Sequence, residues 1–152
     1  MKKVFAVILV VLILAGCAAD QSVSPEPESA LDDGGVIEIE EQYFVAQANQ
    51  ITSNRERYLG RTIRFEGMSA TTYWDDEPFL IVYRNTYGCC GPDGIIGFEV
   101  ALNDIEPFPD NTWVEVTGVL EEFDIFGGHA QILIVNATSI VEMPSRGLEF
   151  VY

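Results

Sequence analysis

Five segments between residues 61 and 143 are rich in β-branched and aromatic residues and are separated by turn-forming stretches. They cover residues 61–74, 79–87, 95–102, 112–123 and 129–143. Gly67 and Gly118 lie inside the first and the fourth segment, and a glycine inside a strand permits the sharp coiling that a closed barrel needs. The sequence therefore predicts a mainly β protein with a small five-stranded OB-like barrel. A small β-sandwich is the alternative, because the number of strands does not separate the two folds.

One short helix is predicted before the barrel. Residues 46–60 place Ile51, Arg55 and Tyr58 on one helical face, with Gly60 as a terminator. Residues 36–45 begin with alternating apolar and acidic residues, which predicts a strand leading into the domain.

The start of the chain has the pattern of an exported lipoprotein. An unbroken apolar run at residues 4–15 follows Lys2 and Lys3 and ends in the sequence LAGC at residues 14–17. The run is too short to span a bilayer, and LAGC resembles the lipobox at which bacterial lipoproteins are cut and lipidated on cysteine. Residues 1–17 are therefore predicted to be a signal peptide, with Cys17 as the lipidated residue on the extracytoplasmic face of the cell membrane. A buried core helix is the alternative.

A polar stretch separates this signal from the folded part. Residues 18–35 are small, polar, acidic and proline-bearing, which predicts a disordered tether. The remaining residues, 36–152, are predicted to form one domain by their length.

The chain is strongly acidic. It has 8 basic and 24 acidic residues, and loss of Lys2 and Lys3 with the signal would leave a net charge of about −18 and no lysine. Such a surface repels phosphate backbones and anionic lipid headgroups, so we expect no nucleic-acid partner and no membrane contact through a basic patch. Cations are the more suitable small partners, although acidity also serves solubility.

Cys89 and Cys90 stand side by side within the sequence YGCCGPDG, residues 87–94. Adjacent Cα atoms lie about 3.8 Å apart, below the usual range for a disulfide, so a bridge between the two would be strained and easily reduced. Zinc and copper(I) take thiolates readily, and a turn of glycines and proline can aim neighbouring side chains together. Metal binding, a redox or vicinal bridge, and a purely structural role all remain open.

Few other residues suit a metal site. Asp93 lies three residues after Cys90, and His129 is the one histidine of the chain; a lone histidine is more often structural than a ligand. The chain contains no HExxH, GxSxG or phosphate-loop motif and no paired CxxC. We therefore expect no enzymatic activity, no catalytic residues, and one metal site of Cys89, Cys90, Asp93 and His129, with zinc as the expected ion.

Three stretches together resemble a known family. They are FLIVYRNTYGCCGPDGIIGFEVAL, NTWVEVTGVLEE and IVEMPSRGLEFVY, and they resemble the C-terminal domain of the YcgQ-like family, uncharacterised bacterial cell-envelope proteins often encoded beside a predicted permease. The resemblance covers about residues 45–152. It implies that Cys89, Cys90, Asp93 and Arg84 correspond to the family's cysteine pair, aspartate and arginine, and that the partner is a transporter.

These observations lead to one expected function. The chain is expected to be a lipid-anchored binding domain outside the cytoplasm, whose cysteine loop binds a transition metal, with Arg84 orienting the loop or neutralising surplus thiolate charge. The alternative is a protein-interaction module without metal, in which the cysteines are structural or vicinally bridged. An oxidoreductase ranks third.

Overall fold

A computed structural model of the chain describes residues 35–74, 76–88 and 91–152, and only the backbone of Pro92 and Asp93. The predicted signal peptide, Cys17, and the tether up to residue 34 therefore lie outside the described residues, as do Cys89 and Cys90. No helix within the described ranges is long and apolar enough to cross a membrane.

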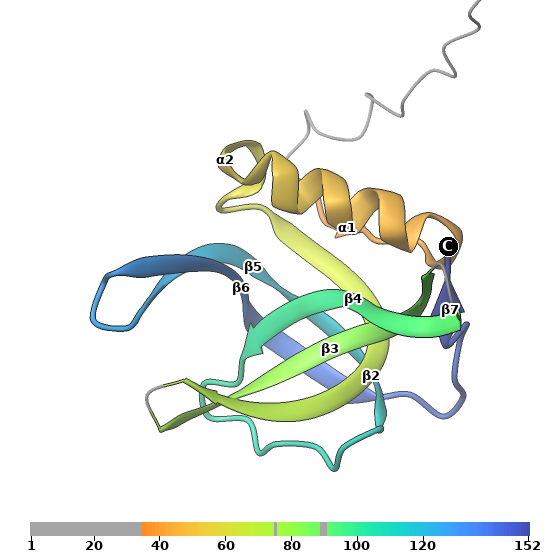
Figure 1. The fold of residues 1–152 in the computed structure, drawn as a ribbon. Coiled ribbons are helices and arrows are strands. Elements are labelled where there is room, and N and C mark those ends of the chain that lie inside the picture. The colour runs from red at the N-terminus through yellow and green to blue at the C-terminus, as the bar shows by residue number, and fades with distance from the viewer. Residues whose placement is uncertain (1–34, 75, 89–90) are drawn as a thin grey trace, which may run out of the picture.

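Five long strands close into a barrel (Figure 1). They are β2 (Thr62–Trp74), β3 (Glu77–Gly88), β4 (Gly91–Ala101), β5 (Trp113–Ile125) and β6 (Ala130–Glu142). Strand β2 pairs antiparallel with both β3 and β5, β3 pairs with β4, and β5 pairs with β6. A short parallel pairing of β4 with β6 completes the ring. The OB-like barrel predicted from the sequence is confirmed.

Glycines sit where two strands approach most closely. A Cβ atom added to Gly67 would lie 2.7 Å from the carbonyl oxygen of Tyr83, and one added to Gly118 would lie 2.5 Å from that of Asn136. Gly97 on β4 is in the same position against β3, at 2.1 Å from the carbonyl oxygen of Val82. A side chain at Gly67, Gly118 or Gly97 would therefore collide with the neighbouring strand, while the coiling role predicted for the first two stays a prediction.

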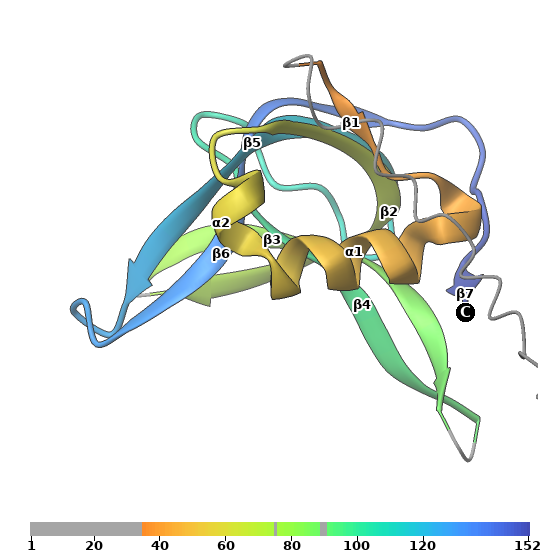
Figure 2. The same cartoon turned by 90° about the horizontal axis from the view of Figure 1, so that it is seen from above.

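A helix closes one open end of the barrel (Figure 2). The described part of the chain begins with the short strand β1 (Ile37–Glu38), the 3-10 helix η2 (Glu41–Tyr43), and the helices α1 (Phe44–Ser53) and α2 (Arg55–Tyr58). Buried residues of the helices, Phe44, Ala48, Ile51 and Tyr58, join the core formed by the inward-facing strand residues. Burial of this apolar face, more than helix propensity, holds such short helices in place.

The structure corrects the bounds of two predicted elements and adds a strand. The leading strand ends at Glu38, and the rest of the segment up to residue 45 turns into η2 and the start of α1, because Phe44 is buried against the barrel. The predicted helix 46–60 starts earlier and breaks at Asn54. A last short strand, β7 (Phe150–Val151), pairs with β3 and was not predicted.

Candidate functional site

The paired ends of β3 and β4 flank the two adjacent cysteines. Gly88 and Gly91 form the last pair of this ladder, so Cys89 and Cys90, outside the described residues, are the only residues that connect the two strands. Figure 2 shows this end of the hairpin extending beyond the barrel. Tyr87 supports its base, with its ring centroid 5.4 Å from that of Tyr152.

Asp93 occupies an irregular position on the same hairpin. Thr86 pairs with Gly94 but Tyr87 pairs with Pro92, so Asp93 is one extra residue on the β4 side. Such a bulge bends the strand and re-aims the local chain. Asp93 is thus close in the ladder to the residues flanking the cysteines, and its part in a metal site stays a prediction.

His129 lies elsewhere. It is exposed in the turn between β5 and β6, and Figures 1 and 2 both show this turn on the opposite side of the barrel from the end of the β3–β4 hairpin. The structure does not bring His129 together with the glycines that flank the cysteines. Within residues 35–74, 76–88 and 91–152, no group of three or more His, Cys, Asp and Glu side chains could hold a metal ion.

Arg84 is buried inside one end of the barrel, with a relative exposure of 2%. Its Nη1 donates hydrogen bonds of 3.0 Å to the Glu41 carboxylate and to the carbonyl oxygen of Leu148, and its Nε donates one of 3.0 Å to the carbonyl oxygen of Glu66. These contacts join η2, β2, β3 and the segment before β7. The predicted role of Arg84 in orienting the cysteine loop stays a prediction, since its described contacts are made with other parts of the chain.

Two aromatic rings and one carboxylate complete this cluster. The Arg84 guanidinium carbon lies 5.0 Å from the ring centroid of Phe44 and 4.9 Å from that of Trp113, within the range of a cation–π interaction. The backbone N–H of Leu148 donates a 2.7 Å hydrogen bond to Glu41. This hydrogen bond and the Arg84 guanidinium lower the pKa of Glu41 and outweigh its partial desolvation.

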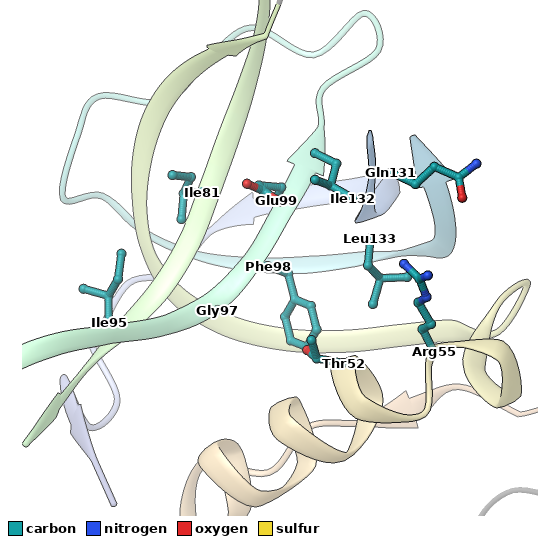
Figure 3. Close-up of a pocket in the computed structure, with 10 residues that line it drawn as sticks. All are labelled: Thr52, Arg55, Ile81, Ile95, Gly97, Phe98, Glu99, Gln131, Ile132 and Leu133. Carbon is teal, nitrogen blue, oxygen red and sulfur yellow. The ribbon is translucent and has the colours of Figure 1, made fainter. Parts of the chain in front are cut away.

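A groove lies where β4 and β6 separate. The two strands pair only from Glu99 to Ala101 and from Ile134 to Asn136, and before these residues they diverge. A cavity of about 520 Å³ opens there, lined by β3, β4, β6 and the ends of α1 and α2. Figure 3 shows the lining side chains, which are mostly apolar.

Among the described residues that line the groove, Glu99 is the one carboxylate. Its neighbours Phe98 and Val100 belong to the core, so Glu99 points to the outer face, where it pairs across the sheet with Ile81 and Ile134. Burial raises the pKa of Glu99. No hydrogen bond or ion pair to its side chain is found among the described residues.

Arg55 also lines the groove, and it forms an ion pair with Glu122. Its Nε lies 3.5 Å from the Glu122 carboxylate. Sequence reasoning missed both Glu99 and this groove. The available signal was a single acidic residue inside the apolar segment IIGFEVAL.

Comparison with known proteins gives a family and little more. A search of the curated proteins found no match. The DUF1980 C-terminal domain, an uncharacterised family, matches residues 16–152. Because this match spans most of the sequence, the chain belongs to the DUF1980 C-terminal domain family.

Proposed function

We propose that this protein is a lipid-anchored, extracytoplasmic binding domain in which Cys89 and Cys90 hold a thiophilic metal ion. Zinc is the ion that we expect, and the resemblance to YcgQ-like proteins suggests that the domain serves a permease. Cys17 is the proposed lipid attachment site, which would keep the barrel at the membrane surface.

The pairing of Gly88 with Gly91 is the observation that carries the metal proposal. Adjacent residues of a regular strand point to opposite faces and would not share one ion. Residues that connect two strands of a hairpin are not bound by this alternation. A connection of two cysteines can therefore present both thiolates to one ion at the end of a projecting hairpin.

Asp93 is the third ligand in this proposal, and His129 is left out because its turn lies across the barrel. Two thiolates and one carboxylate leave a fourth position for water or a partner's residue. Such an incomplete set suits a site that exchanges its metal, as a protein that serves a transporter would need. Arg84 would act on this loop only through the strand.

The test is metal stoichiometry of the reduced protein. We expect about one zinc or copper(I) ion per chain, lost in both Cys89→Ser and Cys90→Ser and retained in His129→Ala, which serves as the matched control. Absence of metal from the reduced wild type, or binding that is indifferent to both serines, would instead favour the interaction module with structural or bridged cysteines.

Membrane attachment has its own test. Cys17→Ser should leave the protein unprocessed or release it from the membrane fraction. Processing and membrane retention equal to the wild type would contradict the lipoprotein part of the proposal without affecting the metal site.

A further inference from the structure

The groove between β4 and β6 holds a carboxylate, Glu99, that no cation of the described residues contacts. Glu99 is half-buried between the apolar side chains of Ile81 and Ile134. The nearby Arg55 is paired with Glu122, and no cation contacts Glu99 within the described part of the chain. A carboxylate removed from water without a partner is unfavourable, so a cationic group that enters the groove would be stabilised there.

The groove also offers open strand edges. Before Glu99, β4 pairs with β3 on one side only, and before Ile134, β6 pairs with β5 on one side only. Both open edges belong to described residues and border the groove. An open edge presents backbone N–H and C=O groups in a row, which is the surface that an extended peptide uses when it adds a strand.

The outer face of β4 sets a spacing for such a peptide. Ile95, Gly97 and Glu99 share this face at two-residue intervals, and Ile95 is 60% exposed. Gly97 lies between them without a side chain, because the backbone of β3 passes too close there for one. A matching strand would place an apolar residue beside Ile95 and a cationic one beside Glu99, four residues apart along β4.

We propose that this groove binds an extended, basic segment of a partner protein, which adds a strand along β4 and places a lysine or arginine against Glu99. The inference stands apart from the cysteine hairpin and uses none of its residues. The negative charge of Glu99 favours a basic partner over the other segments that could occupy the groove. The chain's own residues 18–34 contain five acidic residues and no cation, and a second copy would carry the same net charge of −16.

The test is fluorescence anisotropy with labelled peptides in which Val and Thr alternate and one position is Lys, Gln or Glu. We expect the Lys peptide to bind the wild-type protein, with the Gln and Glu peptides at least about tenfold weaker, since one charge contact of about 1.4 kcal/mol corresponds to that ratio. Glu99→Gln should weaken the Lys peptide by a similar factor. Glu142→Gln, an exposed strand carboxylate outside the groove, should not.

A second arm separates strand addition from simple capture of an amine. N-methylation of alternate amides of the Lys peptide should abolish binding, while n-butylamine should compete only weakly. The proposal is overturned by no binding of the Lys peptide at millimolar concentration, by equal loss in Glu99→Gln and Glu142→Gln, or by a methylated peptide that binds as well as the parent. Glu99→Gln should fold normally, because it removes a half-buried charge.

Discussion

Arg84 and Glu99 lie on neighbouring strands, and Arg84 is buried while Glu99 is half-buried. The two charges differ in the partners that the chain gives them. Arg84 is on the inner face of β3, where three hydrogen bonds and two aromatic rings surround its guanidinium. Glu99 is on the outer face of β4, between isoleucines and with no ionic partner in the described residues. A charge that is fully satisfied by its own chain holds the fold, whereas one left unsatisfied beside a groove is available to a ligand.

The largest effect should come from a carboxylate placed in the core with no partner at all. Val116 is fully buried and faces the barrel interior, so Val116→Asp should lower the free energy of unfolding by about 4 kcal/mol. Urea unfolding measures this loss. A mild effect would mean that the interior tolerates an unpaired charge, and the contrast between Arg84 and Glu99 would lose its basis.

Removal of the partnered charge should come next. Arg84→Met should lower the free energy of unfolding by about 3 kcal/mol, because Glu41 and two carbonyl oxygens lose their donor. Arg64→Met is the control: its pair with Glu38 is exposed to solvent, and its loss should lower the free energy of unfolding far less than the loss of Arg84 does. Equal losses in the two variants would show that burial adds nothing to the Arg84 cluster.

The partner of Arg84 should give the protein an acid-sensitive component. The pKa of Glu41 is lowered in the folded protein by the Leu148 backbone N–H and by Arg84, so the stabilisation is present above its unfolded value near 4.5 and is lost as pH falls through the lower, folded value. Glu41→Gln should therefore be less stable than the wild type at neutral pH and should approach it as pH falls through the folded pKa of Glu41. A difference in stability between the two proteins that stays constant with pH would show that Glu41 is not the source of the acid-sensitive component.

Glu99 should give the smallest effect and the opposite sign. Its pKa is raised by burial, so the folded protein is most stable with Glu99 protonated, and this contribution is lost as pH rises through the raised value. Glu99→Gln should equal the wild type at acidic pH and exceed it slightly at neutral pH, by thermal melting. Glu142→Gln should show no such divergence; if it did, the effect would come from the net charge.

The barrel could be predicted because its determinants are local. Each long strand has its own β-branched and aromatic segment, and Gly67 and Gly118 mark the close approaches that closure requires. The start of the domain could not be predicted as well. The segment around Phe44 becomes helical because the Phe44 side chain packs against strands that follow later in the sequence. A local sequence pattern does not predict such a long-range contact.

The two candidate sites also differ in whether local sequence reveals them. Two adjacent cysteines are visible in any sequence, and so they were singled out. The groove depends on the distance between β4 and β6, which are adjacent in space but separated by β5 in the chain. A single glutamate such as Glu99 acquires its character only from the isoleucines that the fold brings beside it.

The short parallel pairing between β4 and β6 also has a kinetic consequence. Among the described residues, three residue pairs close the barrel there, and they join segments that are far apart in sequence, whereas β2 with β3, β3 with β4 and β5 with β6 are sequential hairpins. Loop closure has to precede such non-local contacts. The hairpins are therefore expected to form first and the seam last, so that the contacts between Val100 and Val135 across the seam should be absent from the folding transition state even where each residue's own hairpin is formed.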